Sequence, residues 1–370
     1  MTQDKTNKVL NVPPLRFPEF SGEWEKYRNE TLFQTISEKN KDKSITKILS
    51  ASQQQGMVER DSLGLDIKFD YDSISSYKIV RKGDYVIHLR SFQGGFAFSE
   101  QIGVCSPAYT ILRPSPMISY GFLKYHFVSN KFIDALRIVT YGIRDGRSIS
   151  VEEWLKLYTS LPKAEEQNKI IQFLNLIDKR IATQIRVIDK LESLIKGISK
   201  MLLAKQGNTY IKDCLICHSS TLQESNVTVL GKYPAWGATG ISGYIETPQV
   251  EQDAILIIKD GASVGNVRYV SGKFGVIGTL NYLTAKNGYN LKYLYFCLRI
   301  FNFTPFITGL AIPHIYFRDY GNAQIYCPDI AYQKRIAENL SNIERKIEIE
   351  MQILDKLKEQ KNYLLSQMFI

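Results

Sequence analysis

Apolar residues recur at alternating steps of three and four along two stretches of the chain, residues 162–206 and 328–370. This spacing averages about 3.5 residues, the repeat of a helix that packs an apolar seam against another helix in a coiled coil. The pattern therefore predicts two long, paired helices. The seam residues that we assign are Ile170, Leu174, Ile177, Ile181, Gln184 and Ile188 in the first stretch, and Ile336, Leu340, Ile343, Ile347, Glu350 and Leu354 in the second.

The two stretches are copies of one sequence. Shifting the first by 166 positions aligns nine identical residues, beginning with Pro162 on Pro328. Both copies start with the pattern Pro-x-x-x-x-Gln, and we expect the proline to occupy the first helical turn. Each copy has one polar residue at the same seam position, Gln184 or Glu350. Because a single polar seam residue commonly fixes the register of a helix pair, we expect these two side chains to share a buried hydrogen bond.

The segments that precede the two helices echo each other more faintly. Gly103-Val104-Cys105-Ser106 is answered by Gly275-Val276-Ile277-Gly278, and Leu123-Lys124-Tyr125 by Leu291-Lys292-Tyr293. Strand-like runs broken by glycine turns, with a helix late in each segment, predict α+β domains. We predict an α+β protein with an internal pseudo-two-fold repeat, in which two domains are joined by two long helices that form an antiparallel coiled coil. The predicted boundaries are 1–161 and 207–327 for the domains, and 162–206 and 328–370 for the central and distal helices.

The composition of the 370-residue chain, 44% hydrophobic and 23% charged, is typical of two or three soluble domains. No apolar run approaches the roughly 18 residues of a membrane-spanning helix, and the first residues carry no secretory signal. Five cysteines do not make a disulfide framework, so we expect a cytoplasmic location and no membrane partner. The net charge of +10 favours a polyanionic partner such as nucleic acid.

Three motifs suggest metal or enzyme chemistry, and each has a simpler interpretation. Cys214-Leu215-Ile216-Cys217-His218 matches the attachment pattern of c-type haem, but the chain has no export signal and no second cysteine pair for zinc. Asp329, Glu344 and Lys346 are residue types of a nuclease site, yet the two acids lie too far apart on one helix to share a metal. Gly237–Gly243 lacks the Lys-Ser or Lys-Thr of a phosphate loop. We therefore expect no enzyme, no metal and no cofactor in this chain.

Glycine-rich polar loops that carry cations remain as candidate binding elements in both domains. Arg and Lys can read guanine, Gln can read adenine, and glycines allow backbone N–H groups to approach phosphates. Arg144 and Arg147 flank Asp145-Gly146 in a predicted turn, which lets both guanidinium groups point the same way. The simpler interpretation, that such loops are only turns, stays open. The candidate DNA-contacting residues are Gln53, Gln54, Arg90, Gln93, Arg144, Arg147 and Ser148 in the first domain, and Gly237, Lys259, Ser263, His314 and Arg318 in the second.

Over its whole length this arrangement resembles the DNA-specificity (S) subunit of type I restriction-modification systems. The opening Pro14-Leu15-Arg16-Phe17-Pro18-Glu19-Phe20 followed by Trp24, the run Tyr233-Pro234-Ala235-Trp236-Gly237-Ala238-Thr239-Gly240 and the repeated Pro-x-x-x-x-Gln helix starts carry the resemblance. The resemblance implies two target-recognition domains, each followed by a spacer helix. The second domain is shorter than the first here, which leaves its share of the base contacts open.

The resemblance also implies a function and partners. Each domain would read one half of a split double-stranded DNA target. Two methyltransferase (M) subunits would dock on this chain, and restriction/translocase (R) subunits would join for cleavage. S-adenosylmethionine, ATP and Mg²⁺ would be held by those partners. We predict a non-catalytic, sequence-specific DNA-binding scaffold; the alternatives are a coiled-coil protein-interaction adaptor without DNA specificity, and an enzyme such as a nuclease.

Overall fold

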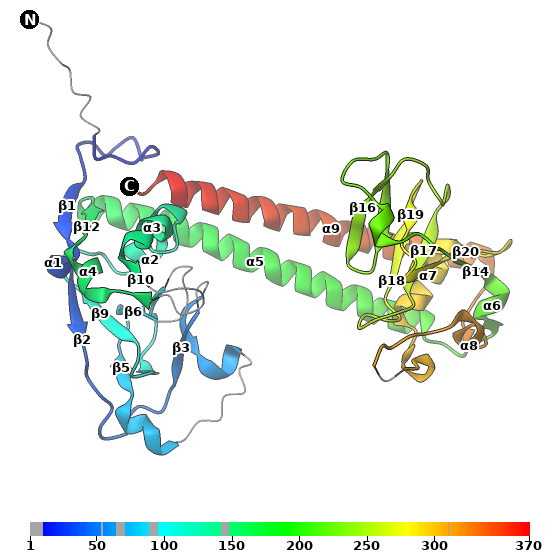
Figure 1. Ribbon diagram of the computed structural model, residues 1–370, viewed down its shortest axis with the longest axis horizontal. Helices are drawn as coiled ribbons and strands as arrows, with labels where there is room; N and C mark the ends of the chain where they lie inside the picture. Colours follow the sequence, from blue (N-terminus) through cyan, green and yellow to red (C-terminus); the bar gives the residue numbers. More distant parts are fainter. Residues whose placement is uncertain (1–9, 53–54, 64–70, 89–94, 142–147, 310) are drawn as a thin grey trace, which may run out of the picture. The chain divides into compact units, whose positions relative to one another are not determined.

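The computed structural model describes residues 10–52, 55–63, 71–88, 95–141, 148–309 and 311–370 (Figure 1). Contacts within the chain divide it into two units. The first unit contains Met1–Thr183 and Leu354–Ile370, and the second contains Gln184–Ile353. Each unit therefore holds one α+β domain together with a part of each long helix.

The two long helices are α5 (Ala164–Leu203) and α9 (Ile330–Gln367), of 40 and 38 residues. In the first unit the beginning of α5 packs against the end of α9, where Ile170 shares a core with Leu364. In the second unit the end of α5 lies in one core with the beginning of α9. The order of these contacts makes the pair antiparallel, as the heptad pattern predicted.

All the assigned seam residues are buried or half-buried. At the polar position, the Gln184 amide donates to the Glu350 backbone carbonyl at 2.9 Å and to its carboxylate at 2.5 Å. Lys346, one turn earlier on α9, forms an ion pair with the same carboxylate at 2.6 Å. Lys346 first, and Gln184 second, hold the pKa of the Glu350 carboxyl below its usual value. A shift in the register of the two helices would leave these polar groups without partners in an apolar seam. The hydrogen bond between Gln184 and Glu350 therefore favours the observed register over shifted ones.

The first domain is built around a four-stranded antiparallel sheet in the order β2-β9-β6-β7. Its elements are β1 (Glu25–Arg28), α1 (Asn29–Leu32), β2 (Phe33–Ile36), β3 (Leu49–Ser52), β4 (Gly56–Glu59), η1 (Arg60–Leu63), η2 (Tyr71–Ser76), β5 (Lys78–Val80), β6 (Tyr85–Ile87), β7 (Phe96–Phe98), β8 (Gly103–Cys105), β9 (Thr110–Pro114), α2 (Phe122–His126), α3 (Asn130–Ala135), η3 (Leu136–Val139), β10 (Thr140–Tyr141), β11 (Ser148–Ile149), α4 (Val151–Lys156) and β12 (Tyr158–Leu161).

The second domain has its own four-stranded antiparallel sheet in the order β14-β20-β17-β18. Its elements are β13 (Thr209–Tyr210), α6 (Ile211–Cys214), β14 (Leu215–Ser219), η5 (Glu224–Asn226), β15 (Tyr233–Gly237), β16 (Gly240–Ile245), β17 (Ala254–Ile258), β18 (Val267–Val270), β19 (Gly275–Val276), β20 (Leu280–Ala285), α7 (Leu291–Ile300), η6 (Thr304–Phe306), α8 (Phe317–Tyr320) and β21 (Gln324–Ile325).

The predicted internal repeat is present as a repeated order of elements. Each domain opens with an edge strand and a one-turn helix, continues with a sheet whose last strand pairs with its first, and then forms a short aromatic helix, α2 or α7. The edge strand then pairs with a returning strand, β1 with β12 and β13 with β21, directly before α5 or α9. The same topology has thus been built twice.

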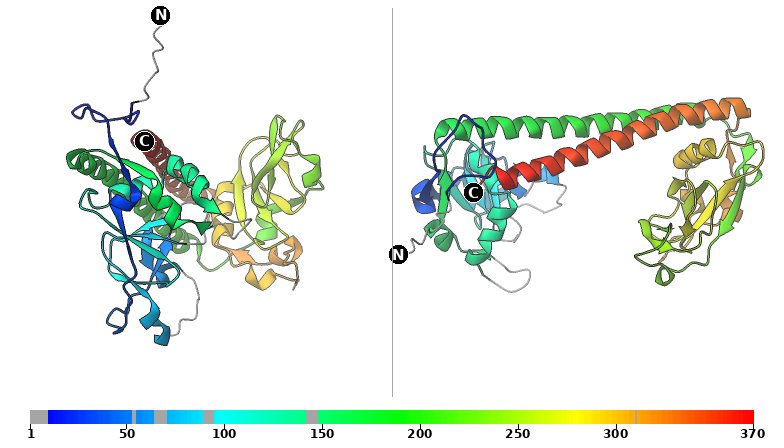
Figure 2. Two further views of the ribbon diagram at one scale, coloured as in Figure 1. Left: turned by 60° about the vertical axis from the view of Figure 1, so that its left-hand side comes forward. Right: turned by 90° about the horizontal axis from the view of Figure 1, so that it is seen from above.

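The end of α9 completes the core of the first domain (Figure 2). Phe369 is 1% exposed, and its ring lies 5.5 Å from that of Phe122 and 6.5 Å from that of Trp24. Its backbone carbonyl accepts a hydrogen bond from the Lys131 ammonium at 3.2 Å. Buried aromatic residues contribute much of the stability of a core, so the first domain depends on residues that come last in the chain.

The repeated Pro-x-x-x-x-Gln pattern joins each domain to its helix. Gln167 is buried; its amide donates to the Pro162 and Met117 carbonyls at 2.9 Å, and its oxygen accepts the Ser119 N–H at 2.8 Å. Gln333 makes equivalent bonds in the second domain. Its amide donates to the carbonyl of its own proline at 2.7 Å, and its oxygen accepts the Asn290 N–H at 3.0 Å.

The prediction that proline occupies the first helical turn is wrong. α5 begins at Ala164 and α9 at Ile330, in each case two residues after the proline. In α9 the carboxylate of Asp329 caps the helix by accepting the Tyr332 N–H at 2.9 Å. The proline therefore lies two positions before the first helical residue, where its carbonyl accepts the glutamine amide.

Candidate nucleic-acid interface

Two loops of the second domain lie side by side at the end of β17. One begins at Lys259, directly after the strand, and the other is residues 312–316. The Gly261 N–H donates to the Pro313 carbonyl at 2.9 Å, and the Ile315 N–H donates to the Lys259 carbonyl at 2.9 Å. The fold thus brings together three of the predicted residues: Lys259, Ser263 and His314.

The loop around His314 is closed by its own backbone. Thr308 and His314 exchange two backbone hydrogen bonds of 2.9 and 2.8 Å. Gly309 has a φ of +88°, and a Cβ there would collide with the Ile312 carbonyl, so the turn requires glycine. Ile312 and Tyr316 remain 65% and 43% exposed. The loop therefore presents an apolar and an aromatic side chain beside an imidazole.

Arg318 lies on α8 next to this loop. Its guanidinium carbon sits 4.7 Å from the centre of the Tyr316 ring, and the His314 ring meets the same tyrosine edge-on at 5.0 Å. The Arg318 side chain is 79% exposed and lies 3.7 Å from the Asp319 carboxylate. An exposed guanidinium held on an aromatic ring can reach a phosphate or the edge of a guanine.

A hollow of about 500 Å³ opens on the same domain, and Gly237, Asn266, Arg268 and Asn302 are among its lining residues. Gly237 ends β15, where a Cβ would collide with the Ser242 hydroxyl. The predicted contact at Gly237 therefore belongs to the hollow and not to the loop pair of Lys259 and His314.

Two polar residues in the hollow were missed by the sequence analysis. Arg268 lies on β18 with its guanidinium carbon 4.9 Å from the centre of the Trp236 ring, and Asn266 is exposed in the turn before that strand. The signal was an isolated arginine within an otherwise apolar and aromatic strand. Among the residues that the structure describes, neither Lys259 nor Arg268 forms an ion pair, so both charges are available to a phosphate.

In the first domain the candidates fall in the connections of three hairpins. β3 pairs with β4 across 53–54, β6 with β7 across 89–94, and β10 with β11 across 142–147. Ser148 opens β11, where its backbone pairs with Tyr141. The remaining candidates lie outside the described residues: Gln53, Gln54, Arg90, Gln93, Arg144 and Arg147.

The haem-like motif is part of the packed second domain. Cys214 ends α6 and is buried, whereas Cys217 and His218 lie on β14. Burial raises the pKa of the Cys217 thiol to about 11, which keeps it protonated and a poor metal ligand. The His218 Nε2 lies 2.9 Å from the Thr284 hydroxyl on the neighbouring strand. The histidine therefore has a partner within the sheet.

The acids of the nuclease-like pattern have separate structural roles. Asp329 caps α9, and Glu344 accepts the hydroxyl of Tyr295 at 2.8 Å. Within the described part of the chain, no group of three or more His, Cys, Asp or Glu side chains could hold a metal ion. None of the helices described is long and apolar enough to cross a bilayer. The chemistry that the domain offers is that of cations, amides and aromatic rings on loops.

Comparison with known proteins places a named domain on this part of the chain. Residues 214–359 match the Type I restriction modification DNA specificity domain. A putative type I restriction enzyme specificity subunit of Haemophilus influenzae, S.HindORF215P, is 34% identical over 89 residues, which are 23% of each chain. The EcoprrI specificity subunit of Escherichia coli is 25% identical over 112 residues, 30% of this chain and 28% of the relative. The matched segments thus span about a quarter of the length of these relatives.

Solved structures extend the likeness in fold to the whole chain. The S subunit of a type I restriction-modification system from M. genitalium superposes with a TM-score of 0.64 at 16% identity, covering 97% of this chain and 99% of the other. A chain from a structure describing complex assembly and conformational transition of the type I system superposes with a TM-score of 0.59 at 15% identity, covering 96% and 99%. This chain is thus similar in sequence to a type I restriction-modification specificity domain over residues 214–359, and similar in fold to an S subunit over nearly its full length.

Proposed function

We propose that this chain binds double-stranded DNA sequence-specifically, as the specificity subunit of a type I restriction-modification complex. The observation that carries the proposal is the specificity domain at residues 214–359, because that segment contains the loops of Lys259, His314 and Arg318. Unpaired or exposed cations beside aromatic rings suit DNA, since phosphate contacts position a protein and side chains at base edges give sequence preference. The second domain would read one half of a bipartite target.

The first domain would read the other half. It repeats the sheet topology of the second domain, and its candidate residues fall in hairpin connections. Arg144 and Arg147 remain the predicted guanine readers there. The two long helices would set the spacing between the half-sites, since each domain is bonded to one of them.

The same chain would scaffold the complex by docking two methyltransferase subunits, to which restriction subunits are added. Apolar side chains outside the seam support this, because exposed apolar residues in number mark surfaces for protein partners. Those on the two long helices include Leu176 (63% exposed), Leu194 (48%) and Met201 (67%) on α5, and Ile349 (44%), Met351 (49%) and Tyr363 (62%) on α9.

The chain itself would be non-catalytic and would act in the cytoplasm. S-adenosylmethionine, ATP and Mg²⁺ would be bound by the methyltransferase and restriction subunits, and this chain would supply only the choice of target. This division of labour is supported by the structural roles of residues that had suggested metal chemistry: Asp329 caps α9, Glu344 accepts the Tyr295 hydroxyl, and Cys214 is buried.

Selection from a random duplex pool tests the proposal. The full chain would be produced together with the methyltransferase subunit proposed as its partner and incubated with the pool. The bound duplexes would be sequenced after several rounds of gel-shift. We expect two short conserved blocks separated by an unread spacer of fixed length. A complex that forms but enriches no sequence would refute DNA reading and favour the adaptor alternative.

A further inference from the structure

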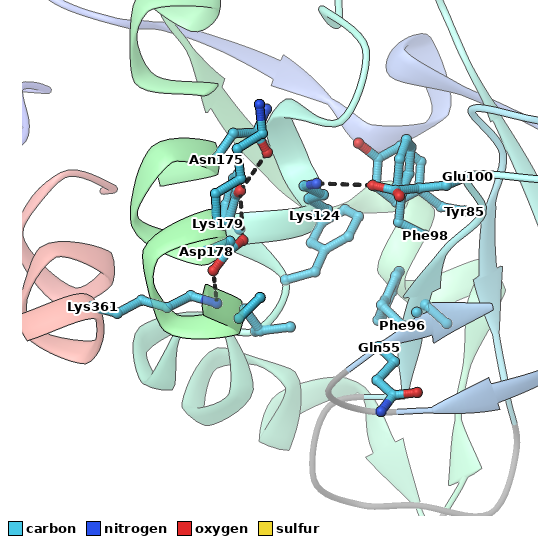
Figure 3. A pocket seen from close by; sticks show the side chains of 16 residues that line it. Gln55, Tyr85, Phe96, Phe98, Glu100, Lys124, Asn175, Asp178, Lys179 and Lys361 are labelled. Carbon is cyan, nitrogen blue, oxygen red and sulfur yellow. Dashed lines mark hydrogen bonds and ion pairs between the residues drawn. The ribbon is translucent and has the colours of Figure 1, made fainter. Parts of the chain in front are cut away.

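A buried tyrosine hydroxyl meets a carboxylate where the first domain packs on α5. Figure 3 shows the helix side of this contact, where Asn175, Asp178 and Lys361 are labelled. The Tyr125 hydroxyl, on the short helix α2, lies 2.8 Å from the Asp178 carboxylate and 2.7 Å from the Asn175 side-chain oxygen. Because a phenol carries one proton, it donates to the carboxylate, the stronger acceptor. Burial first, and the bond to Asp178 second, raise the pKa of Tyr125, so the hydroxyl stays a donor at physiological pH.

The second domain makes the same contact with α9. The Tyr295 hydroxyl, on the short helix α7, donates to the Glu344 carboxylate at 2.8 Å. Glu344 lies 166 residues after Asp178, which is the offset of the internal repeat. Burial raises the pKa of Tyr295 as well. Two independent copies of one joint indicate that the repeat retains the contact between tyrosine and carboxylate.

The two joints obtain their balancing cation from different places. Glu344 pairs with Lys292 at 2.9 Å and with Arg299 at 2.8 Å, both on α7. Asp178 pairs instead with Lys361 of α9 at 2.6 Å. The joint of the first domain therefore connects three elements, α2, α5 and α9, while that of the second connects two.

Each joint works together with the glutamine at the start of the helix. Gln167 precedes Asp178 by 11 residues, and Gln333 precedes Glu344 by the same number. At about 100° and 1.5 Å per residue, 11 residues turn a helix by three turns plus about 20° and advance it by about 16 Å. Both bonds therefore leave from one face of the helix, at two separated points. A single point of attachment would allow the domain to pivot on the helix, whereas two separated points fix the angle between the domain and the helix.

We infer that the pairs Tyr125–Asp178 and Tyr295–Glu344 are positioning residues that hold each recognition domain at a fixed angle on its helix, and so set how strictly the spacer length of the DNA target is read. This inference rests on the proposed function. It assigns no base contact to these residues. Loosening either joint should leave both half-site sequences unchanged and widen the range of accepted spacers.

Conservative variants separate this role from folding. Tyr125→Phe and Tyr295→Phe keep the ring and remove only the hydroxyl. Tyr269→Phe is the matched control, because it removes a hydroxyl that donates to Asp253 at 2.7 Å and keeps the ring, which lies 5.7 Å from that of Tyr295. The bonds between Tyr295 and α9 are left in place. Each variant would be assembled with the methyltransferase and offered duplexes that contain the selected half-sites at every spacer length. We expect preference for the best spacer over neighbours one base pair longer or shorter to fall by about threefold to tenfold in the two joint variants, as loss of one such bond implies.

Each outcome has a distinct meaning. Unchanged spacer preference in both joint variants, even with a lowered melting temperature, would overturn the inference. Equal broadening in Tyr269→Phe would also overturn it. If the wild-type complex selects no DNA, the proposed function fails, and the joint is then judged without DNA. Spin labels attached to cysteines introduced by Ala108→Cys and Gln172→Cys, in a Cys217→Ser background, report the angle of the first domain on α5. A broader distribution of the distance between the two labels in Tyr125→Phe supports the joint, and an unchanged distribution rejects it.

Discussion

Replacing Gln167 with leucine removes the hydrogen bonds at the start of α5 while keeping most of the side-chain volume. The bond to the Pro162 carbonyl is fully buried, and those to Met117 and Ser119 are partly buried. A partly buried bond contributes about 0.5–1.5 kcal/mol, and a buried carbonyl left without a partner costs about 1–3 kcal/mol. We therefore expect Gln167→Leu to lower the free energy of unfolding of the first unit by about 2–6 kcal/mol.

Urea unfolding followed by tryptophan fluorescence measures this loss. Trp24 and Trp154 are buried in the core of the first unit, whereas Trp236 belongs to the second. In a Trp236→Phe background the fluorescence therefore reports the first unit alone. Gln172→Leu is the control, because Gln172 is exposed on the same helix, and exposed substitutions usually stay within about 0.5 kcal/mol.

The reasoning would be refuted if Gln167→Leu and Gln172→Leu unfolded at the same urea concentration. The glutamine would then be replaceable, and its hydrogen bonds would not anchor the domain to the helix. The second domain offers an internal comparison. Gln333 makes one bond fewer than Gln167, so Gln333→Leu should destabilise its own unit by a smaller amount.

Four further predictions follow from the seam and the loops. Arg147→Ala and Arg318→Ala should each weaken target binding by about 1–3 kcal/mol and relax one target position, as read by binding assays on single-base variants of the selected duplex; unchanged affinity and preference would mark the loops as turns. Inserting four residues at matching places in both long helices lengthens each helix by about 6 Å. Because one base pair spans about 3.4 Å, the preferred DNA spacer, selected from a library of randomised spacer lengths, should lengthen by one to two base pairs. An unchanged spacer would mean that the helices do not set the distance between the half-sites. Replacing both Gln184 and Glu350 by leucine should raise the melting temperature by about 2–4 °C and permit shifted registers of the two helices. Shifted registers would be detected as several disulfide cross-links between the helices where the wild type gives one. A single register in the double variant would contradict the role of the polar pair. Lys346 and Gln184 lower the pKa of the Glu350 carboxyl, so the stabilisation of the fold by the ionised carboxylate is present above the ordinary value of 4.5 and is lost as the pH falls through the lowered pKa. Glu350→Gln should therefore flatten the acid side of a plot of melting temperature against pH. An acid slope identical to that of the wild type would count against this role of Glu350.

The seam was readable from the sequence because its chemistry is periodic. A residue every 3.5 positions must be apolar, so an exception such as Gln184 or Glu350 stands out and predicts its own partner. The loop residues have no such constraint. Lys259, Ser263 and His314 were named one by one, and only the backbone pairing between their loops shows that they share a surface. The first-domain candidates outside the described residues stay predictions.

The structure also shows where similarity between the two copies misleads. Alignment matches Tyr125 with Tyr293, but the hydroxyl that meets Glu344 is that of Tyr295, whereas Tyr293 donates to the Tyr326 carbonyl. The face that a side chain occupies depends on the phase of its helix, and α7 is longer than α2. Arg268 was missed for a related reason: its partner, Trp236, lies on β15, a strand of a different sheet that comes near only in the folded domain.

The burial of Phe369 in the first domain has a consequence for biosynthesis. Residues that close this core are separated from Trp24 by nearly the entire chain, so an emerging polypeptide cannot finish its amino-terminal domain when that domain leaves the ribosome. At about 5–20 residues per second, the wait between residue 183 and residue 369 is roughly 10–40 s. During this interval the aromatic face around Phe122 stays uncovered, which makes the nascent chain a substrate for chaperones. The second domain meets no such delay, since its core is complete once α9 has begun, and the chain therefore finishes folding in the reverse of the order in which it is made.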